Sequence, residues 1–177
     1  MTNLFSSTGG NVGRTPGWAN FMGWWDADPL RELLGQNRVD KYGTGGDTRL
    51  LTADGASSIN GTKATPNLSG DIFGDWREEI ILRANSNAAL RIYTTTNVAN
   101  TRIYTLLHDP QYRVAIAWQN TAYNQPPHPG FFIGASMPTP PTPNIVLETA
   151  GHNSLTVFGA PAAGVALSAG PVGPSPS

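Results

Sequence analysis

The chain contains no cysteine, and only two of its 177 residues are lysines, Lys41 and Lys63. The absence of cysteine excludes a disulfide framework and a thiolate metal site, and it leaves the redox compartment open. The other nine of the 11 basic residues are arginines, which are scattered without a basic run, and the net charge is -1. The composition therefore argues against a nucleic-acid partner.

Long apolar runs are also missing. No segment approaches the length needed to span a membrane, so we expect no membrane partner. Residues 1–13 are polar and glycine-rich, so no signal peptide is expected in this chain. With 39% apolar residues, the chain has the length and composition of about one globular domain with its own core.

Short apolar segments bounded by Gly, Asn, Asp or Pro predict an all-β fold of antiparallel sheets, and helix signals are weak. Polar and apolar side chains alternate in residues 89–95, as in a half-buried strand. The Asn-Ser-Asn sequence at 85–87 predicts a hairpin turn before it. The predicted strands are residues 31–34, 39–42, 48–52, 79–83, 89–95, 102–107, 113–118 and 131–134.

Acidic residues cluster before the strand at 79–83. Asp71, Asp75 and Glu79 recur every four residues, a spacing close to that of calcium-binding loops. Between them, Phe73 and Trp76 stand where such loops carry an acid and a glycine. The spacing therefore leaves two alternatives, a Ca²⁺ site or a buried ion-pair network in which Arg77 replaces the metal.

An earlier segment repeats this arrangement. Aligning Asp28 with Asp75 places Glu32 on Glu79, an offset of about 47 residues, which is typical of β-propeller blades. Asp26 supplies the acid that is missing at Phe73. Asp26, Asp28 and Glu32 are therefore a second set of candidate Ca²⁺ ligands.

The C-terminal part differs in composition. From Pro138 the sequence is rich in Pro and Thr, and residues 160–177 contain few large side chains. Such sequences form extended linkers and cannot build a core. We expect an ordered module over residues 1–137, followed by a linker and a low-complexity tail, or a truncated further module, over residues 138–177.

A series of motifs resembles a known family. The motifs are NGTKATP at 60–66, GDWREE at 74–79, LRIYTTT at 90–96, RIYTLLHDPQYR at 102–113 and IAWQNTAYNQPPH at 116–128. In this order, over about residues 17–146, they resemble the C-terminal part of rhamnogalacturonan lyases of polysaccharide lyase family 11.

The resemblance implies an eight-bladed β-propeller that binds Ca²⁺. It also implies extracellular cleavage of the rhamnose–galacturonic acid backbone of rhamnogalacturonan I, a pectic polysaccharide, by β-elimination. The matching part corresponds to about three blades. We therefore expect the remaining blades of a full-length enzyme as a partner, and weak or no activity for this chain alone.

The resemblance also places the site. Elimination needs a base for the proton alpha to the uronate carboxylate, and a cation or strong donors to stabilise the charge that develops. By resemblance, Lys63 and Tyr123 are catalytic, and Asn60, Gly61 and Thr62 bind substrate. Lys63 as base and Lys63 as charge neutraliser remain alternatives.

Two other classes of function remain open. One is a carbohydrate-binding module without catalysis, and the other is a structural, calcium-binding propeller segment. His108 and His128 lack a third partner spaced for a nucleophilic triad or a zinc site. The five tryptophans are expected mainly in the core, between sheets.

Overall fold

A computed structural model describes residues 3–121 and 124–146 of the chain. The chain divides into two compact units, and the elements below all belong to the first, Met1–Ile145. Most of the sequence-predicted tail, residues 147–177, lies outside the described residues. In the part that is described, no helix is long and apolar enough to cross a membrane.

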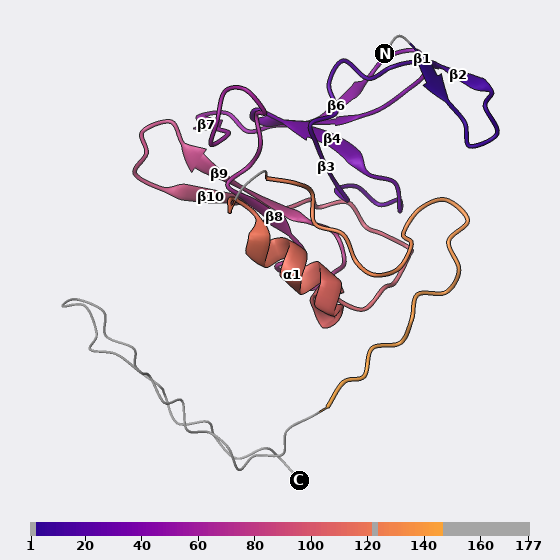
Figure 1. The fold of residues 1–177 in the computed structure, drawn as a ribbon. Coiled ribbons are helices and arrows are strands. Elements are labelled where there is room, and N and C mark those ends of the chain that lie inside the picture. Colours follow the sequence, from indigo (N-terminus) through magenta and orange to yellow (C-terminus); the bar gives the residue numbers. More distant parts are fainter. Residues whose placement is uncertain (1–2, 122–123, 147–177) are drawn as a thin grey trace, which may run out of the picture. The chain divides into compact units, whose positions relative to one another are not determined.

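The first sheet is a four-stranded antiparallel meander (Figure 1). Its strands follow one another in chain order, β3 (Phe21–Gly23), β4 (Glu32–Gly35), β5 (Arg38–Lys41) and β6 (Thr48–Thr52). A separate hairpin, β1 (Asn3–Phe5) and β2 (Asn11–Arg14), precedes it.

The second sheet is built around β9 (Glu79–Ala84). β10 (Leu90–Tyr93) pairs with one edge of β9, while β7 (Ala56–Ser57) and β8 (Leu68–Gly70) pair with its opposite edge. The predicted hairpin turn between β9 and β10 is confirmed: Asn87 adopts a φ of 59°, a left-handed conformation that asparagine tolerates.

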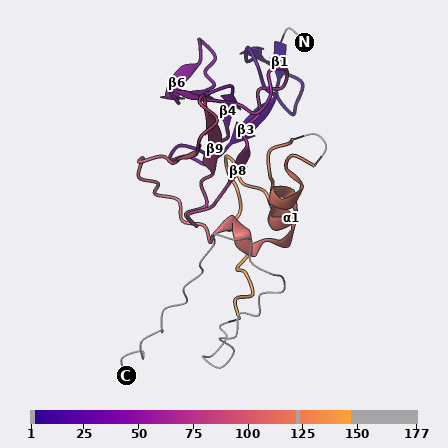
Figure 2. The same ribbon diagram turned by 90° about the vertical axis from the view of Figure 1, so that its left-hand side faces the viewer.

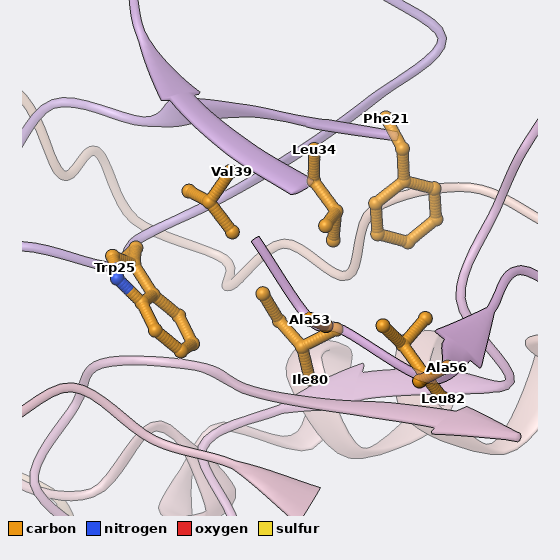
Figure 3. Packing of buried hydrophobic residues seen from close by; sticks show 8 residues of the cluster. All are labelled: Phe21, Trp25, Leu34, Val39, Ala53, Ala56, Ile80 and Leu82. Atoms are coloured by element: carbon orange, nitrogen blue, oxygen red, sulfur yellow. The ribbon is translucent and has the colours of Figure 1, made fainter. Parts of the chain in front are cut away.

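The main core lies between these two sheets (Figure 3). Large apolar side chains of the first sheet meet the aliphatic side chains of β9, and all are at most 5% exposed. The cluster consists of Phe21, Trp25, Leu34, Val39, Ala53, Ala56, Ile80 and Leu82.

The 47-residue repeat places equivalent rows of side chains on corresponding faces of the two sheets. In the first sheet, Phe21 pairs with Leu34 and Leu34 with Val39, and this row faces the core. In the second sheet the equivalent row is Leu68, Ile81 and Ile92. Successive side chains of a strand point to opposite faces of the sheet. Since Ile80 faces the core, Ile81 points to the other face. Ile92 is 52% exposed there.

Residues 113–118, which we predicted as a strand, belong instead to the helix α1 (Pro110–Trp118). Asp109 caps the helix by accepting a hydrogen bond from Tyr112 N at 2.8 Å, and Pro110 occupies the first turn, where its missing N–H costs nothing. Tyr112 and Ala115 are fully buried. Capping and packing thus override the strand preference of these residues.

Two other predicted strands are also wrong. Residues 102–107 are irregular up to the short 3₁₀ helix η1 (Leu106–His108), and residues 131–134 contain no strand. Both segments instead supply side chains to a second core. This core contains Trp24, Trp76, Ala99, Leu106, Tyr112 and Ile133.

Helix α1 lies beside β8 (Figures 1 and 2). The approach is close: a Cβ at Gly70 would lie 2.4 Å from Ile116 Cδ1, so a larger residue here would have to displace the Ile116 side chain. The prediction of an all-β fold with antiparallel sheets is thus confirmed with one helix added. The sheets of the described residues do not close into a barrel.

Candidate functional site

The loop between β3 and β4 carries the first set of acids and is shaped by their hydrogen bonds. Asp28 N donates to Asp26 Oδ1 at 2.9 Å, and Leu30 N donates to Asp28 Oδ1 at 2.8 Å. Buried Glu32 accepts from Trp25 N at 2.8 Å and from Asp26 N at 3.3 Å. These local bonds hold the carboxylates in a tight turn.

The loop between β8 and β9 repeats these bonds 47 residues later. Glu79 accepts from Ile72 N at 2.8 Å and from Phe73 N at 3.0 Å. Arg77 N donates to Asp75 Oδ1 at 3.1 Å, as Leu30 N does to Asp28. The sequence repeat is thus a repeat of structure as well.

In the first loop the acids converge. Asp26, Asp28 and Glu32 each offer one carboxylate oxygen, and these oxygens all lie within 4.8 Å of one another. Lys41 Nζ, from β5, lies among them at 2.5, 2.6 and 3.1 Å respectively. Burial opposes the charge of Lys41, but its hydrogen bonds to the three acids outweigh this and raise the pKa of the ammonium.

Asp71, Asp75 and Glu79 form no such group in the described residues. Asp75 pairs with Arg77, as the ion-pair alternative predicted. Asp71 is fully buried, and its Oδ2 accepts from Leu106 N at 2.7 Å. Its Oδ1 is buried without a hydrogen-bond partner in the described residues.

The two sets of acidic residues differ in how well they could bind a cation. Three converging carboxylates are a suitable partial ligand set for Ca²⁺, which takes oxygen ligands. In the first loop, however, the ammonium of Lys41 fills the space between the carboxylates, so an ion there has to displace it. In the second loop, Asp71 Oδ1 is an unsatisfied buried acceptor, the kind of atom that a cation or water satisfies.

The sequence analysis missed the most buried acid between the two loops, Glu78. Its carboxylate accepts from Trp24 N at 3.0 Å and from Tyr112 Oη at 2.7 Å. Burial raises the pKa of Glu78 to about 7, against the lowering effect of Arg31. The sequence repeat could have indicated this residue, because the 47-residue offset aligns Glu78 with Arg31, a residue of opposite charge.

The sequence-predicted substrate loop is held by the side chain of Asn60. Asn60 Oδ1 accepts from Lys63 N and from Ala64 N, both at 2.9 Å, and its Nδ2 donates to Thr65 Oγ1 at 2.8 Å. The predicted residues Asn60, Gly61, Thr62 and Lys63 are all exposed. The loop therefore presents them to solvent on a rigid turn.

Tyr123, the other predicted catalytic residue, lies outside the described residues. The next residue, Asn124, is 9% exposed and donates from Nδ2 to Pro66 O at 3.0 Å. Asn120 Nδ2 in turn donates to Asn67 O. These bonds bring the segment that follows α1 next to residues 66 and 67, close in sequence to Lys63.

The expected packing role of the tryptophans is confirmed for Trp24, Trp25 and Trp76, which are at most 5% exposed. Trp118 is 45% exposed, and its ring centroid lies 6.3 Å from that of His128.

Residues 1–143 match the family model of rhamnogalacturonan lyase family 11, C-terminal domain. The chain therefore belongs to this family, as the sequence resemblance indicated. It is 53% identical over 146 residues to the rhamnogalacturonan endolyase YesW of Bacillus subtilis, and 46% identical over 155 residues to the exolyase YesX of the same organism. Each alignment covers 81% of this chain but only 24% and 25%, respectively, of the relative.

Solved structures agree. The crystal structure of YesW matches with a TM-score of 0.77 at 51% identity, over 84% of this chain and 26% of that chain. A Bacillus licheniformis rhamnogalacturonan lyase also matches with a TM-score of 0.77, at 53% identity, over 83% of this chain and 26% of that chain. The chain thus spans about a quarter of the length of the relatives it matches.

Proposed function

We propose that the chain forms the C-terminal part of an extracellular rhamnogalacturonan lyase, which cleaves the rhamnose–galacturonic acid backbone of pectin by β-elimination. The observation that carries the proposal is the 53% identity to an endolyase over 146 residues, which include the loop at 60–63. The extracellular location follows from the family resemblance. The chain alone is expected to be weakly active or inactive.

In this proposal the chain's own residues supply the proton chemistry. Lys63 projects from an exposed, rigid loop, and its ammonium either neutralises the uronate carboxylate or, deprotonated, accepts the alpha proton. Tyr123 assists by binding substrate or by transferring a proton. The backbone of Gly61 and the side chains of Asn60 and Thr62 then orient the sugar.

Ca²⁺ is proposed as the cofactor, with Asp26, Asp28 and Glu32 as one ligand set and Asp71, Asp75 and Glu79 as the other. When bound, the ion supplies positive charge that offsets the clustered carboxylates and stiffens the loops. Because both loops end at the first residue of a buried strand, Glu32 or Glu79, such stiffening also fixes the sheets.

We further propose that the two sheets and the preceding hairpin belong to a partial β-propeller of about three blades. The four-stranded meander of β3–β6 has the architecture of a blade. The row Leu68, Ile81 and Ile92 supports this arrangement, because it repeats the row by which the first sheet packs on the second. The remaining blades of the lyase are the partner that would cover it.

A chimera tests the lyase function. Residues 1–143 replace the matching quarter of the B. subtilis endolyase, and the absorbance of the unsaturated uronate product is followed on rhamnogalacturonan I. We expect an active chimera, in which Lys63→Ala and Tyr123→Phe each lower turnover about 100-fold or more at unchanged Tm.

The matched control is Arg102→Ala, which removes a cation outside the loop. Turnover of both site variants within about threefold of the parent chimera would place the chemistry elsewhere in the enzyme. Rhamnogalacturonan binding by an inactive chimera would instead favour a carbohydrate-binding module.

A further inference from the structure

A second concave surface adjoins the substrate loop. It is a cleft of about 360 Å³ between the two sheets' hairpin turns, and Gly61 of the substrate loop forms part of its wall. The other polar residues of the wall are Gln36, Asn37, Ser57, Ser58 and Asn85.

The wall is polar but uncharged. Its polar side chains are amides and hydroxyls, which both donate and accept hydrogen bonds. Sites for uronates or phosphates instead use Arg or Lys, which pair with the anion. The chemistry of the wall therefore suits a neutral, hydroxyl-rich ligand.

Backbone hydrogen bonds fix the turns that carry these side chains. Gln36, at a φ of 56°, donates from its N–H to Ala64 O at 2.9 Å, which ties the β4–β5 turn to the substrate loop. Asn85 N donates to Gly55 O at 2.9 Å, which fixes the start of the β9–β10 turn. A ligand therefore meets a largely preformed wall and does not have to order it.

Several donors and acceptors of the wall remain available. The hydroxyl of Ser57 bonds to Asn85 Oδ1, which orients Asn85. In the described part of the chain, neither Asn85 Nδ2 nor the side-chain amide of Gln36 makes a hydrogen bond, and Asn37 uses only its Nδ2, toward Ala53 O.

We propose that this cleft is a subsite for the neutral 6-deoxyhexose unit of the backbone, next to a uronate held at Lys63. This inference rests on the proposed function and adds a sugar-selective surface to it. The volume accommodates one sugar ring, and Gly61 joins the cleft to the loop that carries Lys63. Gln36, Asn37 and Asn85 are its specificity-determining residues.

Binding is tested with the full chain, labelled with ¹⁵N, by following side-chain amide resonances. The two probes are a tetrasaccharide of alternating rhamnose and galacturonic acid, and trigalacturonic acid. We expect saturable shifts at Gln36, Asn37 and Asn85 with the tetrasaccharide only. Equal shifts with both probes, or none at these residues, would overturn the subsite.

The same spectra distinguish a failure of the proposed subsite from a failure of the proposed substrate loop. Shifts confined to residues 60–63 would remove the subsite and leave the proposed substrate loop. An absence of shifts at both places would count against carbohydrate binding by this chain altogether.

Kinetics of the chimera provide an independent test. Asn85→Ala and Gln36→Ala are each expected to raise KM about three- to tenfold, the value of one lost neutral hydrogen bond, with little change in kcat. Asn100→Ala, at an exposed position outside the cleft, is the matched control. Unchanged KM in both cleft variants would overturn the subsite even if the chimera is active.

Discussion

The two sheets carry equivalent rows of apolar side chains that differ in burial. In the first sheet, Phe21, Leu34 and Val39 are at most 3% exposed, because the second sheet covers them. In the second sheet, the equivalent Leu68 and Ile81 are half-buried and Ile92 is 52% exposed. The difference shows that burial here depends on a neighbouring sheet, since the apolar pattern of the strands is the same.

The sheets also differ at their edges. β5 is covered by β6, whereas the equivalent strand β10 forms the edge of the second sheet. In the first sheet, β5 is followed by β6. In the second sheet, β10 is followed by residues 102–107, which form no strand and contribute to the second core. A strand with one open edge and with exposed Leu90 and Ile92 is a surface for further β-structure.

The largest expected effect on stability is a difference between the buried row of the first sheet and the more exposed row of the second sheet. Leu34→Ala should lower the free energy of unfolding by about 2–5 kcal/mol, because it leaves a cavity between the sheets. Ile92→Ala should cost less than about 1 kcal/mol, because its side chain is already half in water. Urea unfolding followed by tryptophan fluorescence measures both, and equal losses would contradict the comparison.

The next effect concerns Arg31 and Glu78, which occupy equivalent positions. Burial raises the pKa of Glu78 from 4.5 to about 7, so the folded state keeps a proton that the unfolded state releases. The contribution of Glu78 to the free energy of unfolding should therefore fall by roughly 3 kcal/mol as pH rises from about 4.5 to about 7, and this contribution is constant above that window.

Glu78→Gln removes the titrating carboxyl group, so the free energy of unfolding should fall less as pH rises. Unfolding free energies measured at about pH 5 and about pH 8 check the prediction. Identical slopes for the parent and the variant would show that Glu78 is ionised in both states.

A smaller effect distinguishes the two acidic loops. Lys41→Met leaves three converging carboxylates without their cation and should cost about 1–3 kcal/mol, since Glu32 is buried but Lys41 is a third exposed. Arg77→Met, the counterpart in the second loop, should cost about 0–1 kcal/mol, because Asp75 is 41% exposed. Thermal melts measure both.

Ca²⁺ should also distinguish the two acidic loops. With Lys41 removed, millimolar Ca²⁺ has open access to Asp26, Asp28 and Glu32, so it should raise the Tm of Lys41→Met more than that of the parent. Melts in chelator provide the reference. Superimposable melts of Lys41→Met with Ca²⁺ and with chelator would reject the first loop as a calcium site.

The smallest effect is expected at the end of the module. Limited proteolysis should cut after about residue 137 before it cuts either sheet, because a Pro-Thr sequence offers few sheet hydrogen bonds. Mass spectrometry of the fragments measures this, and removal of the tail should leave the Tm nearly unchanged. Cleavage within β9 at the same rate would contradict the boundary.

The sequence predicted those elements whose signals are local. The hairpin of β9 and β10 has alternating side chains and an Asn-Ser-Asn turn, and both strands form as predicted. Short strands such as β7 (Ala56–Ser57) were missed, because two or three residues show no periodicity. Helix α1 was missed because its β-branched and aromatic residues favour strands, while its stability comes from the Asp109 cap and burial of Tyr112.

The candidate site was predictable to a similar degree. The spacing of Asp26, Asp28 and Glu32 predicted that their carboxylates converge, since all three belong to one loop. Lys41 was not predicted to join them, because its position depends on the pairing of β4 with β5. Residues brought together by strand pairing cannot be inferred from spacing alone.

The open row of the second sheet has a consequence for synthesis. In the C-terminal domain of a lyase, β9 and β10 leave the ribosome late, after most of the polypeptide that we propose covers them. Domains fold as they emerge, N-terminal parts first. The exposed Leu90 and Ile92 would then meet a folded partner at once, so this apolar sheet edge would be uncovered only briefly during translation.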